Sequence, residues 1–417
     1  MKNNNNSAFV LLFVGPIGGA QKRFVNLVIF MNKLYPGNHF MIVSYSLFNQ
    51  IKELFVLNDY NMFIPVGSCT TVIETNIKNP KSKAKNSTNF QNSVFKAIQK
   101  SLLYKLFYFY RSRLEQHKTF LEIKEIVRKY HITSLIGVFN GIIPLYFYLK
   151  KNTSRPGIIY CNMDSWFSSI SLNAHKDWHR KYVSFNYAHE KSDLVDFLSP
   201  FICKGIQGLG IKIPDAKVRI TPCSFTDYSK CHIGAKNKFR IAFSGRLEND
   251  KNPVMFINAA IVLAKKYPDV EFHILGEGRL SEVIRDITVN SNLPNIVFHG
   301  FHPNPPEILA GTSVFVSIQT TNNYPSQSVL EAMACGNAII ATDVGDTRLF
   351  MDKDKGSLIE LSYDALSEEL ENYIMNPNDA RIKGNAASEY VRKNHTIKQV
   401  ADYYLNLLNE AAIISKK

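Results

Sequence analysis

Two cationic side chains stand close together in the second half of the chain. Arg246 follows an apolar run at 239–244 that predicts a strand, and Lys251 precedes a helical pattern at 253–267. The intervening Gly245 lets the backbone approach a ligand closely. A guanidinium offers a planar fork of donors and an ammonium offers a point charge, a pairing that suits a diphosphate. We expect Arg246 and Lys251 to bind a diphosphate; the alternative is that both are ordinary surface cations.

A second set of polar residues opens the helix that is predicted at 326–335. Ser326, Gln327 and Ser328 fall in its first turn, where backbone N–H groups are free to bind phosphate oxygens. Glu331 lies about one turn further on, among apolar neighbours. A carboxylate in such surroundings is costly unless a group donates hydrogen bonds to it, as a ribose diol would. Local backbone donors are the alternative partner.

A scaffold of parallel strands is needed to bring these residues together. Short, continuously apolar runs alternate with helical patterns in both halves of the chain, which is typical of parallel strands covered on both faces. The pattern therefore predicts an α/β protein with two doubly wound, Rossmann-like sheets that face each other across a cleft. The predicted strands lie at 8–14, 40–44, 61–66, 135–139, 157–161 and 194–198, and at 239–244, 270–275, 296–299, 313–318, 338–342 and 357–360.

The length of 417 residues fits two domains of about 200 residues each. We place an N-terminal domain at 1–228 and a C-terminal domain at 235–385. No strand pattern follows, and residues 386–417 predict a helical segment that packs back toward the N-terminal domain.

The charge is divided unevenly between the two halves. Residues 1–230 contain 30 Lys and Arg against 13 Asp and Glu, whereas residues 231–417 contain 19 against 22. Such a division indicates an anionic partner for the first half, namely a membrane surface, a phosphorylated carrier or nucleic acid; the alternative is a basic surface that keeps the chain soluble. No nucleic-acid-binding motif supports the third partner, so we predict none. The basic, aromatic segment 95–130 predicts a helix on an anionic bilayer surface, and a buried aromatic helix is an equal alternative.

The localisation that the sequence predicts is cytoplasmic, on the inner face of the cell membrane. The apolar run at 8–14 is about half as long as a membrane crossing requires, and residues 1–6 lack a cleavable signal pattern. The six cysteines form no Cys-x-x-Cys pair, which argues against a structural zinc or a disulfide framework.

The second half contains five motifs and the start of the chain one more. They are Gly-Gly-Ala-Gln-Lys-Arg at 18–23, Ser-Gly-Arg-Leu to Lys-Asn-Pro over 244–253, His-Ile-Leu-Gly-Glu-Gly at 273–278, His-Gly-Phe at 299–301, Tyr-Pro-Ser-Gln-Ser-Val-Leu-Glu-Ala-Met-Ala-Cys-Gly at 324–336 and Ala-Thr-Asp-Val-Gly at 341–345. In this order and spacing they resemble the retaining glycosyltransferases of family 4, which have the GT-B fold. Phe-Leu-Ser-Pro at 197–200 and Thr-Pro-Cys-Ser-Phe at 221–225 resemble the connecting segment of members that build bacterial surface polysaccharides.

The resemblance implies a donor site made by both domains, with 1–228 as the acceptor-side domain and 235–385 as the nucleotide-sugar-binding domain. Arg246 and Lys251 would hold the nucleotide diphosphate, and Glu331 would hold the ribose. The first turn of the 326–335 helix would meet the phosphate or the donor sugar. The remaining donor-binding positions are Gly18 and Gly19, which would approach the diphosphate from the other domain, Gly245 beside Arg246, and Gly300 and Phe301, which would border the nucleobase.

One position departs from the pattern of the family. The usual second Glu, eight residues before Glu331, is replaced by Asn323, with Asn322 beside it. Either asparagine could hydrogen-bond a sugar hydroxyl, but neither carries charge. Asp164, which follows the strand at 157–161, is a further catalytic candidate that could orient the acceptor or the donor sugar.

The function that follows is transfer of a sugar from a UDP- or GDP-linked donor to a hydroxyl of a saccharide acceptor that is lipid-linked, with retention of configuration, in cell-surface polysaccharide biosynthesis. No metal or other cofactor is expected, because two cations can stabilise the departing diphosphate. A catalytically degenerate nucleotide-sugar-binding or scaffold subunit, motivated by Asn323, and a nucleotide-sugar epimerase are the alternatives. A nicotinamide dehydrogenase is excluded because no Gly-x-Gly-x-x-Gly turn follows a strand.

Overall fold

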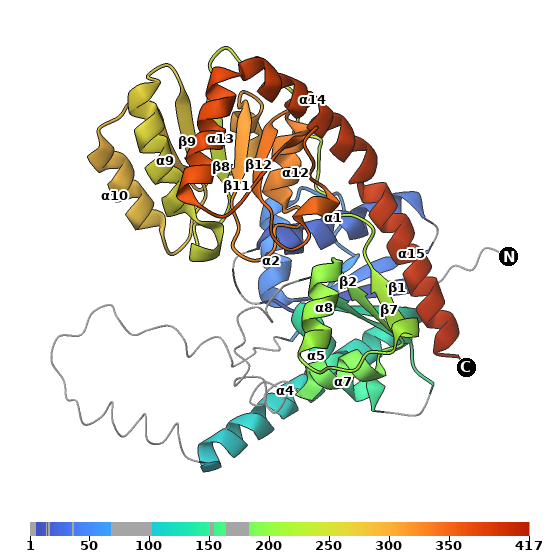
Figure 1. Ribbon diagram of the computed structural model, residues 1–417. Coiled ribbons are helices and arrows are strands. Elements are labelled where there is room, and N and C mark those ends of the chain that lie inside the picture. The colour runs from blue at the N-terminus through green and yellow to red at the C-terminus, as the bar shows by residue number, and fades with distance from the viewer. Residues whose placement is uncertain are drawn as a thin grey trace.

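The computed structural model describes residues 6–13, 15, 17–35, 37–67, 102–150, 154–163 and 183–416, with the backbone alone described at 102–109 and 183–184. The chain forms two α/β domains, one above the other in Figure 1. The N-terminal sheet has seven parallel strands in the order β3-β2-β1-β4-β5-β6-β7, and the C-terminal sheet has six in the order β10-β9-β8-β11-β12-β13. The two doubly wound sheets predicted from the sequence are therefore confirmed.

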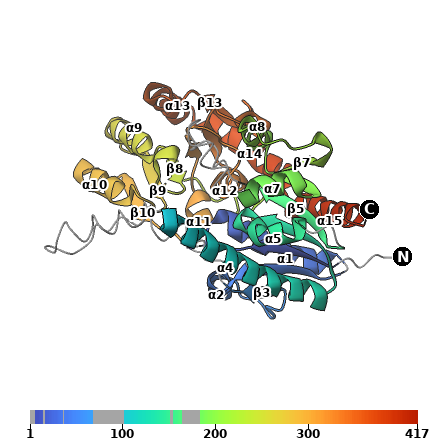
Figure 2. The same ribbon diagram turned by 90° about the horizontal axis from the view of Figure 1, so that it is seen from below.

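The N-terminal domain alternates strands with helices that cover both faces of the sheet (Figure 2). Residues on alternate positions of the first strand face opposite cores: Phe9 packs with one set of helices, whereas Ala8 and Val10 pack with another. Its elements are β1 (Asn6–Leu11), α1 (Gly19–Leu34), β2 (His39–Ser44), α2 (Tyr45–Leu54), β3 (Phe63–Val66), α4 (Leu102–Lys129), β4 (Ile132–Val138), α5 (Ile142–Leu149), β5 (Gly157–Asn162), α7 (Val183–Lys191), β6 (Leu194–Phe197), α8 (Pro200–Gly208) and β7 (Val218–Ile220).

The C-terminal domain repeats this plan with shorter loops. Ile241 and Phe243 face a core with α9, α10 and α13, and Ala242 faces a second core with α11, α12 and α14. Its elements are β8 (Arg240–Ser244), α9 (Pro253–Lys266), β9 (Glu271–Leu275), α10 (Ser281–Ser291), β10 (Ile296–Gly300), α11 (Pro305–Leu309), β11 (Val314–Ser317), α12 (Gln327–Ala334), β12 (Ala338–Thr342), β13 (Gly356–Ile359), α13 (Tyr363–Met375), α14 (Pro377–Asn394) and α15 (Ile397–Ile414).

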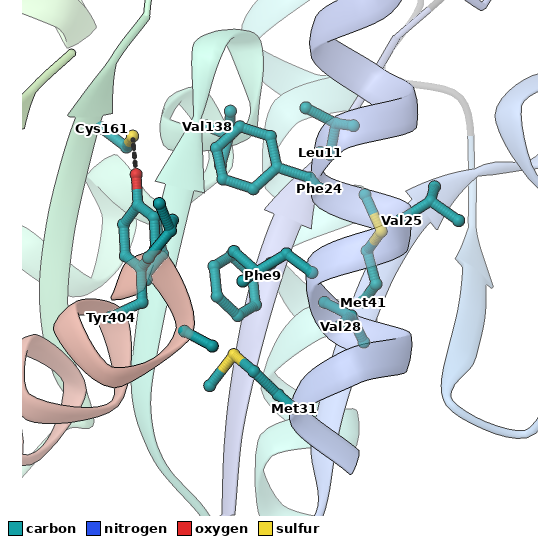
Figure 3. Close-up of a cluster of buried hydrophobic side chains, with 14 of the residues drawn as sticks. Phe9, Leu11, Phe24, Val25, Val28, Met31, Met41, Val138, Cys161 and Tyr404 are labelled. Atoms are coloured by element: carbon teal, nitrogen blue, oxygen red, sulfur yellow. Dashed lines mark hydrogen bonds between the residues drawn. The ribbon is translucent and has the colours of Figure 1, made fainter. Parts of the chain in front are cut away.

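The last helix belongs to the core of the N-terminal domain. α14 covers the C-terminal domain, and α15 continues past it along the N-terminal domain (Figure 1). Thr396 caps α15 by accepting a hydrogen bond from the Gln399 N–H at 3.2 Å. Figure 3 shows Tyr404 of α15 beside Phe9 and Phe24, with its hydroxyl 3.3 Å from the Cys161 Sγ. The chain therefore crosses between the domains twice, once after β7 and once before α15.

One strand and the start of the final helical segment differ from the sequence prediction. β7 was not predicted because it has three residues and none of them is fully buried. The final helical segment begins at Pro377 rather than at residue 386, since the buried face of α14 is made mostly of small residues that give a weak apolar pattern. One of them, Gly384, lies so close to Gly336 that an added Cβ would be 2.1 Å from the Gly336 oxygen.

Candidate donor and active site

The loop that follows β8 carries both predicted cations. Arg246 is exposed, whereas the Lys251 side chain is 22% exposed and its Nζ donates to the Gln319 Oε1 at the end of β11. The Asp250 Oδ2 lies 3.8 Å from the same Nζ. The structure therefore places Arg246 and Lys251 on one loop at the carboxyl end of the sheet, with Lys251 directed inward and Arg246 directed to the surface.

Two glycines that had no predicted role fix the shape of this loop. Gly276, after β9, has a φ of +128°, and a Cβ added there would lie 1.8 Å from the Gly245 oxygen. A Cβ at Gly278 would lie 2.4 Å from the Leu247 oxygen. The Gly245 N–H in turn donates to the Leu275 oxygen at 3.1 Å. Because the two loops touch backbone to backbone, the position of Arg246 depends on glycine at 276 and 278.

The first turn of α12 lies at the edge of the C-terminal domain that meets α1. Ser326 is the N-cap, and its Oγ accepts from the Val329 N–H at 3.4 Å and lies 3.0 Å from the Ser328 Oγ. A Cβ added to Gly19 at the start of α1 would lie 2.8 Å from the Gln327 Oε1. The N-termini of α1 and α12 therefore approach each other from the two domains. Two helix N-termini with glycine on one side and serine on the other suit an anionic ligand.

Glu331 is largely buried on α12, and its surroundings favour the neutral acid. Burial raises the pKa of its carboxyl to about 7, while a hydrogen bond from the Thr226 hydroxyl at 3.4 Å and the charge of Lys22 act in the opposite direction. Thr226 belongs to the segment between the domains and Lys22 to α1. One weak donor leaves most of the acceptor capacity of this carboxylate unused, so it can accept hydrogen bonds from a ligand.

Asn322 and Asn323 lie in different surroundings. Asn323 is fully buried: its Oδ1 accepts from the Ser317 Oγ at 2.8 Å and the Gln319 Nε2 at 2.7 Å, and its Nδ2 donates to the Ser317 oxygen at 2.6 Å. The Asn323 amide is therefore hydrogen-bonded inside the domain, and the contact of Asn322 or Asn323 with the donor stays a prediction. Asn322 is partly exposed, and its Oδ1 accepts from the Asp346 N–H at 3.0 Å.

The predicted nucleobase border lies at the end of β10. Gly300 has a φ of +64° and its oxygen accepts from the Gly276 N–H at 2.7 Å, which ties this turn to the loop after β9. The Phe301 side chain is 65% exposed. An exposed aromatic ring beside a strand end can stack on a base.

Other features of the site could not be read from the sequence. The Asp346 Oδ2 accepts from the Phe201 N–H at 2.8 Å, so a carboxylate of the C-terminal domain caps α8 of the N-terminal domain. Asp164 lies outside the described residues. Among the residues that the structure describes, no group of three or more His, Cys, Asp or Glu could hold a metal ion, and no helix is long and apolar enough to cross a bilayer.

Two doubly wound parallel sheets, joined by a segment after β7 and by a returning C-terminal helix, define the GT-B fold. A glycosyltransferase of Rickettsia africae has this fold with a TM-score of 0.68 at 14% identity, covering 98% of this chain and 99% of that one. Anabaena Alr3699/HepE, solved with UDP-glucose, has a TM-score of 0.67 at 14% identity, covering 97% and 99%. At such identities the likeness shows the fold.

The comparison of sequences finds a family match in the C-terminal domain. Residues 238–376 match the family model of the glycosyl transferases group 1, and this segment includes every candidate from Gly245 to Glu331. D-inositol 3-phosphate glycosyltransferase of Arthrobacter sp. (strain FB24) is 27% identical over 156 residues, 35% of this chain and 37% of that protein. The chain thus matches little more than a third of the length of this curated relative. The family model thus covers the C-terminal domain, and the solved structures show the GT-B fold of the whole chain.

Proposed function

We propose that the protein transfers a sugar from a nucleotide-diphosphate sugar to a hydroxyl of a saccharide acceptor, with retention of configuration. The observation that carries this proposal is the largely buried Glu331, with unused acceptor capacity, beside the place where the N-termini of α1 and α12 meet. A carboxylate that can accept from a ribose diol and two helix N-termini that can accept a diphosphate fit one nucleotide sugar.

The chemistry in this proposal needs cations more than it needs a base. The departing phosphate takes the proton of the acceptor hydroxyl as the new bond forms on the same face of the sugar. Lys251 and Arg246 stabilise the charge that grows on the diphosphate, and no metal ion is required for this step. Lys251 is held for the role by Gln319 at the end of β11. Arg246, on the same loop, reaches the diphosphate from the surface once the donor is bound.

The acceptor in this proposal is lipid-linked, and the enzyme works at the cytoplasmic face of the membrane in the synthesis of a surface polysaccharide. The exposed side of α4 supports the membrane part, because it presents Tyr110, Leu114 and Leu121 between the cations Arg111 and Lys124. Apolar side chains flanked by cations are typical of a helix that lies on an anionic bilayer.

Arg246→Ala and Lys251→Ala test the proposal. Each variant should lower the turnover of a labelled nucleotide sugar with a membrane lipid extract by about 10²–10³-fold, since each removes one preorganised contact to the transition state. Lys265→Ala, an exposed cation on α9, is the matched control and should keep wild-type turnover. Near wild-type turnover in both site variants would reject the assigned roles. Nucleotide binding without transfer to any extract would instead favour a binding subunit.

A further inference from the structure

Arg23 is a buried cation that makes no hydrogen bond or ion pair with the residues that the structure describes. It lies on α1, is 7% exposed, and its Nε has no hydrogen-bond acceptor. The Phe225 ring lies beside the guanidinium, with its centroid 5.8 Å from the Arg23 Cζ. Burial lowers the pKa of the guanidinium below its usual range. Buried arginines are normally paired, because an uncompensated charge costs several kcal/mol.

The guanidinium lies at the edge of the N-terminal sheet where ligands are expected. It lines a small cavity together with residues that follow β5, β6 and β7, and the carboxyl ends of parallel strands are the ligand-binding edge of such a sheet. The hydroxyls of two lining residues donate to the buried Asp196, Thr221 at 3.2 Å and Tyr404 at 2.9 Å, and both hydroxyls are neutral. The cavity is lined by Arg23, Phe24, Met163, Leu198, Thr221, Cys223, Phe225, Val400 and Tyr404.

The position of Arg23 relates it to the donor site. Gly19 contacts Gln327, and the charge of Lys22 acts on the Glu331 carboxyl, so this face of α1 looks toward α12. Arg23 is four residues after Gly19, which is about one helical turn or 6 Å along the axis. The guanidinium therefore lies one turn below the junction of the two helix N-termini, on the N-terminal-domain side.

We propose that Arg23 binds an oxyanion carried by the acceptor, a phosphate or a carboxylate, so that the acceptor is a negatively charged saccharide. This inference rests on the proposed function. The free volume of the cavity is about 10 Å³, room for about one water, so a side chain in its wall must turn aside when the oxyanion enters. Met163 and Leu198, at the ends of β5 and β6, are the wall residues on the sheet edge.

The competing explanation is structural, namely that aromatic rings stabilise Arg23 as a packing residue. The two explanations predict opposite effects of Arg23→Met, which removes the charge and keeps an unbranched apolar stem. A packing role predicts a lower melting temperature for the variant. A ligand-binding role predicts a melting temperature that is higher by about 2 °C or more, because a buried unpaired charge is lost from the free protein.

The decisive measurement is a phosphate titration of the full chain, followed by thermal unfolding at constant ionic strength. UDP is added to saturation so that the donor site is filled, and the titration is repeated without UDP. Phosphate should raise the melting temperature of the wild type in both series. In the presence of UDP it should do so less in Arg23→Lys and should leave Arg23→Met unchanged. Lys33→Met, an exposed cation on the same helix, is the matched control and should respond as the wild type does. Acetate in place of phosphate distinguishes a carboxylate site from a phosphate site.

Two results would overturn the inference: an equal phosphate response in wild type and Arg23→Met in the presence of UDP, or a lower melting temperature of Arg23→Met without any ligand. The proposed function is judged separately, by binding of UDP and GDP to Arg23→Met. Nucleotide binding with no Arg23-dependent phosphate response removes this inference alone. If the wild type binds neither UDP nor GDP, the proposed donor site is wrong, whatever the result of the phosphate titration.

Discussion

Replacing Glu331 by glutamine tests the donor site through its pH dependence. Burial raises the pKa of the Glu331 carboxyl to about 7. A ribose diol that donates to this group favours its ionised form, so donor binding competes with protonation. With this pKa, about one molecule in eleven is ionised at pH 6 and about ten in eleven at pH 8. The Kd of the donor should therefore be about tenfold larger at pH 6, which corresponds to about 1.4 kcal/mol.

Isothermal titration with UDP-glucose, and with GDP-mannose in parallel, is the suitable assay. A nucleotide sugar is preferable to UDP, because the terminal phosphate of UDP itself titrates near pH 6. Binding at pH 6 should release nearly one proton, which appears as a dependence of the heat on the ionisation enthalpy of the buffer. Glu331→Gln should bind about 10–100-fold more weakly at pH 8, since a charged acceptor is lost, and should show no pH dependence. A flat wild-type profile, or a slope that persists in the variant, would refute the role of Glu331.

The same carboxyl should influence stability, with a sign that follows from its raised pKa. The folded protein binds this proton more tightly than the unfolded chain does, so the fold loses stability as the pH rises from about 4.5 through 7. The ionisation costs up to about 3 kcal/mol at pH 8. Without ligand, Glu331→Gln should therefore have a higher melting temperature than the wild type at pH 8, and this advantage should shrink toward pH 5.

Two further predictions concern Gly276, in the loop after β9, and the binding of α4 to a membrane. Gly276→Ala should lower the melting temperature and abolish donor binding, because its Cβ would lie 1.8 Å from the Gly245 oxygen, in a φ region that alanine avoids. Gly208→Ala is the control, since nothing lies within 4 Å of the Cβ added there. Equal stability of the two variants would contradict the reasoning. Removing Arg111 and Lys124 together should weaken flotation with phosphatidylserine vesicles at low salt by about 30-fold, at about 1 kcal/mol per cation. The double variant Lys265→Ala and Lys353→Ala, on the other domain, should leave flotation unchanged. If the wild type does not float at low salt, the proposed membrane binding of α4 is wrong.

The sheets could be predicted from the sequence because each strand is covered on both faces. β2 and β12 are buried at every position, so residues 40–43 and 338–341 each form an uninterrupted apolar run. β7 is the informative failure, since a three-residue strand with partly exposed side chains has no such run and exists only because β6 offers it a partner. The pattern of apolar residues in the sequence reflects burial, and a strand at the margin of a sheet is buried too little to produce such a pattern.

The candidate site was predictable only where one local segment supplies it. The loop with Arg246 and Lys251 and the first turn of α12 are each read from a few adjacent residues. Arg23 was quoted in a motif but received no role, because its burial depends on Thr221, Phe225 and Tyr404, which lie about 200 and 380 residues away along the chain. Glu331 is intermediate: its apolar neighbours are local, but Lys22 and Thr226, which act on its pKa, come from other segments.

The two asparagines illustrate why a departure from a family pattern need not mean loss of activity. An ionised glutamate at 323 would stand at a fully buried position, where Ser317 and Gln319 now hydrogen-bond an amide, and burying that charge would cost several kcal/mol. At 322 it would face the turn of Asp346, whose carboxylate caps α8 across the domain junction. Two carboxylates there would repel each other and weaken the contact between the domains. A neutral side chain thus follows from burial at 323 and from the interdomain contact at 322, and the proposed donor site keeps its cations and Glu331.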